Sequence, residues 1–316
     1  MIGIKNIMKR DLLSLRDLTS TEVHELLELT EQLKQDNYHL NNQLKGKSIA
    51  LVFQKPSNRT RVSFEVGINQ LGGNCIYLGP DEINLGVRES IADVSKTLSR
   101  YLSGIVARTN THADISELAK NSSVPIINGL SDLYHPCQAL TDIYSIKEKF
   151  GKTEGLTLAY IGDGNNVCHS LLLGCAKVGI NVNVATPAKY EPQKDIVQLA
   201  QTCANDTGAK IMTTHSPQEA VEGVDVIYAD VWISMGQEEE SKTRLKDFDG
   251  YQVNSKLAQL ANKDFIFMHC LPAHRDQEVT AEIIDGEHSI VFDQAENRLH
   301  TQKAILITLL GDNPNL

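Results

Sequence analysis

Hydrophobic and polar positions alternate along this chain with two different periods. Short apolar runs such as residues 48–53 ("SIALVF") have the length and β-branched content of buried strands. Between these runs lie longer segments whose apolar residues recur every three to four positions, as in residues 19–34, where Thr19 and Glu22 also form a T-x-x-E capping box. Strands that alternate with helices predict an α/β fold with parallel sheets.

The first half of the chain predicts one parallel sheet. Its predicted strands are residues 48–53, 75–79, 104–108 and 124–128, and its predicted helices are residues 19–34, a segment ending at Leu71, 90–102 and 112–121.

The second half predicts another sheet. Residues 156–179 have the form of a strand, a Gly-rich loop and a helix. Further strands are predicted at residues 181–187, 210–215, 224–232, 265–270 and 289–294, and a final helix at about 295–310. We therefore predict two doubly wound parallel-sheet domains, 1–150 and 151–294, with an active-site cleft between them. Residues 295–316 are expected to pack back on the first domain.

Composition and charge narrow the class of protein. The chain has 316 residues, of which 41% are hydrophobic and 22% charged, as in ordinary globular enzymes. A net charge of −10 argues against nucleic acid or an anionic membrane as partner. Six cysteines without a C-x-x-C pair predict neither a disulfide framework nor a zinc site, and no signal peptide or membrane span is visible. We expect a cytoplasmic protein without a metal.

Candidate chemistry gathers where predicted strands end, because open α/β sheets bind ligands at that edge. Residues 57–61 ("SNRTR") follow a strand and open a helix, so backbone N–H groups and guanidinium groups can meet one anion, most naturally a phosphate. Arg108 ends the strand "GIVAR" and is a second candidate for that anion. The alternative is that these arginines are solvated surface residues.

Two further candidates lie in "HPCQ" (135–138). His135 precedes a proline at a first helical position, and Gln138 lies one turn into the helix. A histidine at a helix start tends to be neutral, and it can then donate a hydrogen bond to a carbonyl oxygen. A plain capping role is equally compatible with the sequence.

The second half offers candidates for a small polar ligand. The loop "GDGNNV" (162–167) resembles a dinucleotide motif but lacks the third glycine, so Asn166 is expected to offer its amide to a small ligand instead. Asp230 ends a strand before Ser234-Met235-Gly236, where a carboxylate can pair with an ammonium group, although most such aspartates are caps.

The segment "MHCLPAHR" (268–275) places Cys270 at a strand end, with Leu271 expected to be extended because Pro272 follows. Cys270 lacks companions for a metal site and an evident base for a nucleophile, so it is expected to line a polar pocket. Arg298, expected in the first turn of the last helix, is either a surface ion-pair residue or another donor to the site.

Together these motifs resemble the ornithine carbamoyltransferases. S-x-R-T-R, H-P-C-Q, G-D-G-N-N, D-x-x-x-S-M-G, H-C-L-P and E-N-R-x-H occur in that family's order, from about Leu12 to Gly311. Aspartate carbamoyltransferases share the first motifs only, whereas D-x-x-x-S-M-G with H-C-L-P points to ornithine.

The resemblance implies transfer of the carbamoyl group of carbamoyl phosphate to the δ-amine of L-ornithine, without a cofactor and in a homotrimer. By matching position it implies that Ser57, Asn58, Arg59, Thr60 and Arg108 hold the phosphate and that His135, Gln138 and Arg298 address the carbamoyl group. It implies that Asn166, Asp230, Ser234 and Met235 hold ornithine, and that Cys270 and Leu271 line the site of the attacking amine. Among these, Arg108, His135, Cys270 and Arg298 are the expected catalytic residues.

Two positions depart from the family pattern. Asn58 replaces the usual Thr, and Asn84 replaces the usual Gln of a loop that, in the family, reaches the phosphate site of a neighbouring subunit. Both residues keep a polar donor but change its reach, so we expect weaker binding of carbamoyl phosphate.

Three alternatives stay open at this point. A carbamoyltransferase for another amine, such as putrescine, would share the phosphate site. A nicotinamide-dependent dehydrogenase would need residues 162–167 to bind a dinucleotide. A non-catalytic ligand-binding paralogue would keep the fold, but the presence of His135, Cys270 and Arg298 argues against it.

Overall fold

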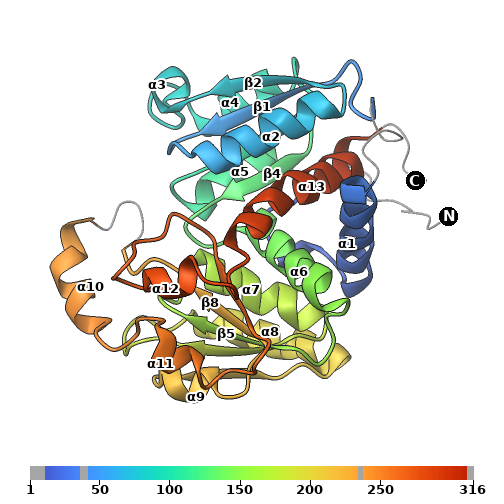
Figure 1. Cartoon of the computed structure of the whole chain (residues 1–316). Helices are drawn as coiled ribbons and strands as arrows, with labels where there is room; N and C mark the ends of the chain where they lie inside the picture. The colour runs from blue at the N-terminus through green and yellow to red at the C-terminus, as the bar shows by residue number, and fades with distance from the viewer. Residues whose placement is uncertain (1–10, 36–41, 234–237, 312–316) are drawn as a thin grey trace. The chain divides into compact units, whose positions relative to one another are not determined.

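The computed structural model describes residues 11–35, 42–233 and 238–311 of the chain. The chain divides into two compact units (Figure 1). Unit 1 comprises Met1–Tyr144 and Glu296–Leu316, and unit 2 comprises Ser145–Ala295. The divisions fall inside two helices, α6 (Pro136–Phe150) and α13 (Val291–Leu310).

Unit 1 contains a four-stranded sheet in the order β2-β1-β3-β4, in which every pair is parallel. Its strands are β1 (Ser48–Phe53), β2 (Asn74–Leu78), β3 (Gly104–Arg108) and β4 (Ile126–Leu130). Its other helices are η1 (Leu15–Asp17), α1 (Ser20–Gln35), α2 (Asn58–Gln70), α3 (Pro80–Ile83), α4 (Ile91–Leu98) and α5 (His112–Asn121).

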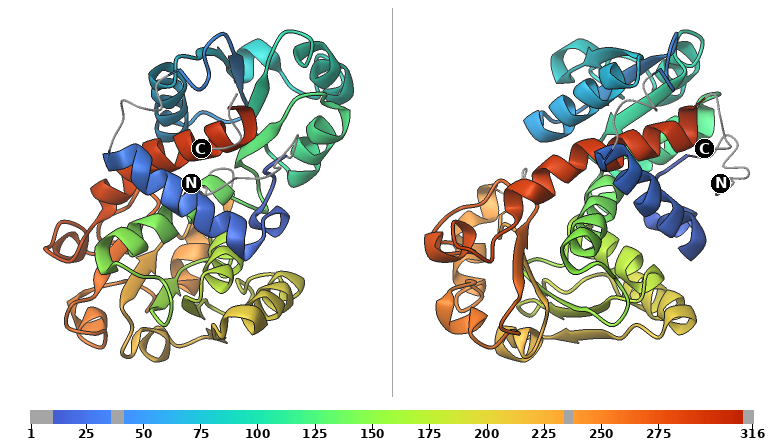
Figure 2. Two further views of the ribbon diagram at one scale, coloured as in Figure 1. Left: turned by 90° about the vertical axis from the view of Figure 1, so that its right-hand side faces the viewer. Right: turned by 45° about the vertical axis from the view of Figure 1, so that its right-hand side comes forward.

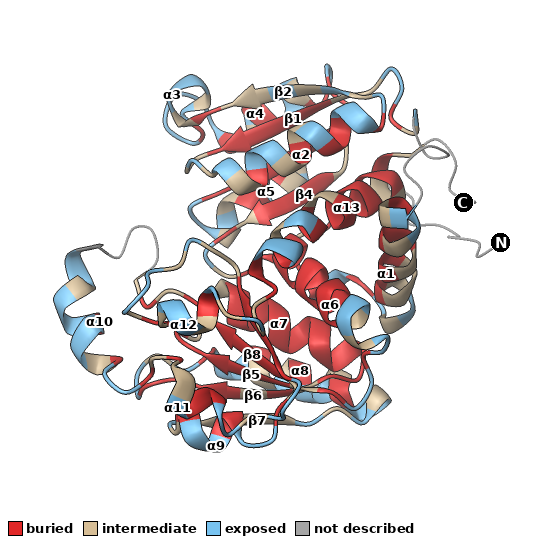
Figure 3. Ribbon diagram, viewed as in Figure 1, coloured by how far each residue is buried: buried red, intermediate tan, exposed pale blue. Residues whose placement is uncertain are grey.

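The core of unit 1 lies on both faces of this sheet. Residues of α4 and α5, such as Val94 and Leu118, pack with Ala50 and Ile105 of the strands. The uninterrupted apolar sequence of β1 reflects this double burial, since parallel strands are covered on both faces. Figure 3 shows β1 buried and the outward face of α2 exposed. In both views of Figure 2, α1 lies beside α13, where Lys34 Nζ donates to Asn297 Oδ1 at 2.7 Å.

Unit 2 contains a five-stranded parallel sheet in the order β7-β6-β5-β8-β9. Its strands are β5 (Thr157–Ile161), β6 (Asn181–Ala185), β7 (Ile211–Thr214), β8 (Val226–Ala229) and β9 (Ile266–His269). Its other helices are α7 (Asn166–Lys177), α8 (Lys194–Thr207), α9 (Pro217–Val221), η2 (Glu238–Glu240), α10 (Ser241–Asp247), α11 (Ser255–Ala258) and α12 (Ala281–Ile284). The predicted α/β class with two parallel sheets is therefore confirmed.

One predicted strand is wrong. Residues 289–294 ("SIVFDQ") contribute only an isolated bridge between Ser289 and Phe267, and α13 already begins at Val291. The apolar run fits either period, but Val291 and Gln294 are buried while Phe292 is 71% exposed, which is a helical pattern. Arg298 consequently lies two turns into α13 and not in its first turn.

The register of each sheet decides which loops meet. In unit 1, Phe53 lies opposite Arg108, so the start of α2 follows directly beside the end of β3. In unit 2, Ile161 lies opposite Ala229, and Ala229 lies opposite His269. The Gly-rich loop, Asp230 and Cys270 therefore emerge side by side at one sheet edge.

Candidate active site

The start of α2 provides donors and no negative charge. Ser57 is extended (φ −160°) and caps the helix, with its Oγ accepting from the N–H of Thr60 at 3.4 Å. Asn58 Oδ1 accepts from the N–H of Arg59 at 2.8 Å. No acidic residue occupies the first turn, although the positive end of a helix dipole favours one. An external anion would satisfy this helix end.

Arg108 carries a buried charge that has no counterion among the described residues. The residue is 4% exposed, and its Nε has no hydrogen-bond partner among the described residues. Burial and the neighbouring Arg298 and Arg59 lower the pKa of Arg108 from its ordinary 12.5 to about 10. Desolvated charges of one sign are costly together, so this arrangement favours an anion with more than one negative charge.

His135 lies beside the same arginines. It is 5% exposed and directly precedes α6. The pKa of His135 is well below its usual range, first because the ring is buried and then because Arg298, Arg108 and Arg59 are near. A neutral imidazole was predicted from its position at a helix start, but burial and the arginines are the causes that the structure identifies.

Arg298 is held by residues far away in the sequence. Its Nη1 donates to Gln138 Oε1 at 2.5 Å, and its Nη2 donates to Thr60 Oγ1 at 3.4 Å. Gln138 Nε2 in turn donates to Asp142 Oδ1 at 2.8 Å. These contacts join α13, α6 and α2, so the guanidinium of Arg298 is held in one orientation. We call Arg59, Arg108, His135 and Arg298 the cationic cluster.

Two residues of the sequence hypothesis lie apart from the cationic cluster. Arg61 was expected to help bind the anion, but its Nε donates to Glu65 at 2.9 Å and its guanidinium stacks 3.7 Å from the ring centre of Tyr77. Glu65 lies four residues after Arg61 on the same face of α2, which explains the ion pair between them. Asn84 is exposed and caps α3 with φ +45°, a conformation that Asn tolerates well.

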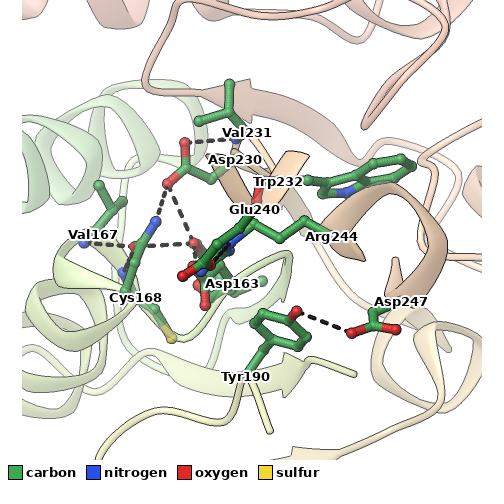
Figure 4. A network of polar contacts seen from close by, with 12 residues as sticks. Asp163, Val167, Cys168, Tyr190, Asp230, Val231, Trp232, Glu240, Arg244 and Asp247 are labelled. Atoms are coloured by element: carbon green, nitrogen blue, oxygen red, sulfur yellow. Dashed lines mark hydrogen bonds and ion pairs between the residues drawn. The ribbon is translucent and has the colours of Figure 1, made fainter. Parts of the chain in front are cut away.

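In unit 2, Asp230 is the centre of a buried network, part of which Figure 4 shows. One oxygen, Oδ1, accepts from the N–H of Val231 at 2.8 Å and from the thiol of Cys270 at 3.0 Å. The other, Oδ2, accepts from Asn165 Nδ2 at 2.7 Å and from the hydroxyl of Tyr160 at 3.4 Å. The carboxylate is 3% exposed and is thus aimed by four groups.

Asn165 and Tyr160 are the residues that sequence reasoning missed. Asn166 was predicted as the ligand-binding amide, and it is the first residue of α7. Asn165, one position earlier, caps that helix by accepting from the N–H groups of Val167 and Cys168 at 2.9 and 3.2 Å, while its amide donates to Asp230. The repeated Asn of the motif was the available signal for Asn165, and the role of Asn166 toward a ligand stays a prediction.

The segment after β9 turns sharply. Leu271 was expected to be extended, but its φ is +58°, so that expectation is wrong. Its N–H donates to His269 Nδ1 at 2.9 Å, and His269 Nε2 lies 3.2 Å from Glu278 Oε1. This buried pair holds the turn that presents Cys270. Ser234 and Met235 lie outside the described residues.

Metal sites, disulfides and membrane-spanning helices each place their own requirements on the described side chains. Across residues 11–35, 42–233 and 238–311, no group of three or more His, Cys, Asp or Glu is arranged to hold a metal ion. All six cysteines are free. No described helix has the length and apolar character needed to cross a membrane.

The fold is that of a two-unit α/β protein with parallel sheets, and its cationic cluster is suited to a small anion. Residues 10–148 match the family model "Aspartate/ornithine carbamoyltransferase, carbamoyl-P binding domain", and residues 154–309 match the model of the "Asp/Orn binding domain". The chain therefore belongs to the aspartate/ornithine carbamoyltransferase family.

Known relatives match almost the whole chain. An ornithine carbamoyltransferase of Carboxydothermus hydrogenoformans is 54% identical over 96% of this chain and 98% of its own length. One of Thermococcus kodakarensis is 50% identical over 98% of both chains. The structure of ornithine carbamoyltransferase from Pyrococcus furiosus matches with a TM-score of 0.93 and 48% identity, covering 96% of this chain and 98% of that one.

Proposed function

We propose that this protein transfers the carbamoyl group of carbamoyl phosphate to the δ-amine of L-ornithine, giving L-citrulline and phosphate. The observation that carries the proposal is that the two halves of the chain, residues 10–148 and 154–309, match the family domains for the two substrates. Arg59, Arg108 and His135 lie in the range that matches the carbamoyl-P binding domain, whereas Asp230 and Arg298 lie in the other range, although Arg298 belongs to unit 1 of the structure.

In the proposed reaction no covalent intermediate with the protein is needed, because carbamoyl phosphate is already an activated acyl donor. The protein must neutralise the departing phosphate, polarise the carbonyl and align the amine. Ser57, Asn58, Arg59, Thr60 and Arg108 are proposed to bind the phosphate, where the unpartnered Nε of Arg108 supports this role. His135, Gln138 and Arg298 are proposed to bind the carbamoyl group.

A neutral His135 suits this task. It donates a hydrogen bond to the carbonyl oxygen without adding a further positive charge to a site that already holds arginines. Arg298 supplies the charge that stabilises the oxyanion as it develops.

On the ornithine side, Asp230 is proposed to bind the α-ammonium group together with Asn166, Ser234 and Met235, while Cys270 and Leu271 line the position of the δ-amine. The amine attacks directly in its neutral form. An alkylammonium with the lysine reference pKa of ~10.4 is neutral in about one molecule in 10³ at pH 7, equivalent to ~4–5 kcal/mol.

The geometry weighs against the dehydrogenase alternative. The N–H of Gly164 donates to the carbonyl of Tyr190 at 2.8 Å, and a Cβ built on Gly164 would lie 2.2 Å from the nitrogen of Pro192. This glycine is therefore explained by the close approach of another backbone segment, and no dinucleotide is needed to explain it.

We further propose a cytoplasmic homotrimer, acting in arginine biosynthesis. The exposed apolar residues Val62 and Val66 of α2 and Ile76 of the edge strand β2 support an oligomer, because unpaired edges with apolar side chains are usually covered. In such a trimer Asn84 would contribute to a neighbouring phosphate site. Light scattering should give three times the chain mass of 34.9 kDa.

The experiment that tests the function is formation of the carbamoylated product from carbamoyl phosphate by the purified protein, with ornithine, putrescine and aspartate as parallel acceptors. Product with ornithine alone is expected. Product with putrescine instead would retain the phosphate assignments and overturn the ornithine ones. If folded protein binds carbamoyl phosphate but forms no product with any of the three acceptors, the non-catalytic binding paralogue would be favoured.

A further inference from the structure

The buried side chain of Arg244 in α10 meets three acceptors from three parts of unit 2 (Figure 4). Its Nη1 donates to Asp163 Oδ2 at 2.8 Å and to the carbonyl of Trp232 at 2.9 Å, and its Nε donates to Glu240 Oε2 at 3.0 Å. The guanidinium also lies 4.9 Å from the ring centre of Tyr190. Only 7% of the Arg244 side chain and 11% of the Asp163 side chain are exposed, so this ion pair is shielded from solvent, whereas Glu240 is 63% exposed.

Two of these acceptors lie beside the residues that aim Asp230. Asp163 is two residues before Asn165, whose amide donates to Asp230 at 2.7 Å. Trp232 is two residues after Asp230 itself. Arg244 therefore binds the chain near both partners of the Asn165–Asp230 hydrogen bond, through Asp163 on one side and Trp232 on the other.

The loop that carries Asp163 has little freedom otherwise. The backbone carbonyl of Asp163 accepts from the hydroxyl of Tyr160 at 2.8 Å and from the N–H of Asn165 at 2.7 Å. Tyr190, which packs against the Arg244 guanidinium, is also bound to α10, because its hydroxyl donates to Asp247 Oδ2 at 3.0 Å. The Asp163 carboxylate joins this loop to α10 through Arg244.

We propose that Arg244 is a positioning residue for the ornithine half of the site: through Asp163 and the carbonyl of Trp232 it sets the orientation in which Asn165 holds Asp230 toward the amino-acid end of the substrate. The inference rests on the proposed function. Burial raises the pKa of the Asp163 carboxyl and Arg244 opposes that rise, so the arginine also helps to keep its partner charged.

A planar guanidinium is required because one nitrogen serves Asp163 and Trp232 while another serves Glu240. A lysine ammonium carries the same charge, but it has a single nitrogen and cannot donate in both of these directions from two separate atoms. Arg244→Lys is therefore expected to recover only part of what Arg244→Met loses.

The test measures steady-state kinetics of Arg244→Met, Arg244→Lys and the matched control Lys246→Met, an exposed cation on the same helix. In Arg244→Met the KM for ornithine should rise about 10–100-fold, since small misplacements of a positioning group cost that much. The KM for carbamoyl phosphate should stay within about twofold. Arg244→Lys should give an intermediate KM for ornithine, and Lys246→Met should equal the wild type.

A second readout separates positioning from reduced folding. Calorimetric binding of L-norvaline, which has the amino-acid end of ornithine but no δ-amine, should weaken in parallel with the KM. Asp163→Asn should also raise the KM for ornithine, and the double variant with Arg244→Met should be no worse than the more affected single variant, because the two residues act as a unit.

An unchanged KM for ornithine in folded Arg244→Met would overturn the inference, as would equal rises in both KM values or additive effects in the double variant. A wild-type protein that makes no citrulline would instead overturn the proposed function, so the two failures are distinguishable.

Discussion

Replacing Arg108 with Met should make the free protein more stable and at the same time abolish its response to phosphate. Arg108 is buried next to Arg59 and Arg298, and no side-chain hydrogen bond or ion pair to it exists among the residues that the structure describes. Met has a similar length, no charge and no polar atom that requires a partner.

The magnitude follows from the pKa. A value lowered from 12.5 to about 10 is a difference of about 2.5, and each pKa unit is worth about 1.4 kcal/mol, so the folded protein holds this charge at a cost of roughly 3 kcal/mol. Arg108→Met should raise the free energy of unfolding of the ligand-free protein by up to that amount. At ~2–4 °C per kcal/mol, the melting temperature should rise by several degrees.

Phosphate should nearly cancel this advantage. An anion present at about 100 times its Kd stabilises the wild type by about 2.7 kcal/mol, whereas the variant has lost a principal binding group and should gain little. Scanning calorimetry and circular dichroism, in phosphate-free buffer and with added inorganic phosphate, measure both effects. Fluorescence is unsuitable, because the single tryptophan, Trp232, lies in unit 2.

The control is Arg100→Met, the same substitution at an exposed arginine of unit 1, which should change stability by less than about 0.5 kcal/mol. The reasoning would be refuted if Arg108→Met melted below the wild type without phosphate. It would be refuted equally if phosphate stabilised the variant as much as the wild type.

Three further predictions concern pH and the carbamoyl phosphate site. With ornithine, kcat/KM should rise with pH through the neutral range, because the neutral amine attacks; a flat profile from pH 6.5 to 8.5, with chemistry or ornithine capture limiting, would count against this mechanism. Asn58→Thr should lower the KM for carbamoyl phosphate, and an unchanged or higher value would discard the idea that Asn58 weakens binding. Burial lowers the pKa of His112, His135 and His300, so below pH ~6.5 these three side chains bind more protons in the unfolded chain than in the folded one. The free energy of unfolding should therefore fall as pH drops from 7.5 to 5.5. The substitution His135→Gln should reduce that pH dependence and should also lower kcat about 10²–10³-fold. A His135→Gln variant with the wild-type pH dependence of stability would show that this ring is not buried in its neutral form.

Much of the fold was predictable because its signals are local. Buried parallel strands are continuous apolar runs, and the T-x-x-E box at Thr19 forms as predicted, with the Thr19 N–H donating to Glu22 at 2.7 Å. The failure at residues 289–294 has a local cause too, since a short apolar run fits a strand and a helix start equally well.

The location of the candidate site residues was also partly predictable from local signals. In a parallel sheet every strand delivers the residue after its last one to the same edge, so the polar residues at strand ends, such as Asp230 and Cys270, could be expected to meet. Their hydrogen bond at 3.0 Å agrees with that expectation.

The sequence by itself determined the two parallel α/β sheets, the family and the residue types at the strand ends, because each of these depends on patterns within a few tens of residues. Only the tertiary structure decided that Arg298 binds Gln138, 160 residues earlier, that Arg61 binds Glu65 and stacks on Tyr77, and that the Asn165 amide donates to Asp230. Such pairings are set by the packing of distant helices and by the exact turn of a loop. The backbone conformation at a single loop residue decides which side chain reaches a partner, and the hydrophobic periodicity of the sequence carries no information about it.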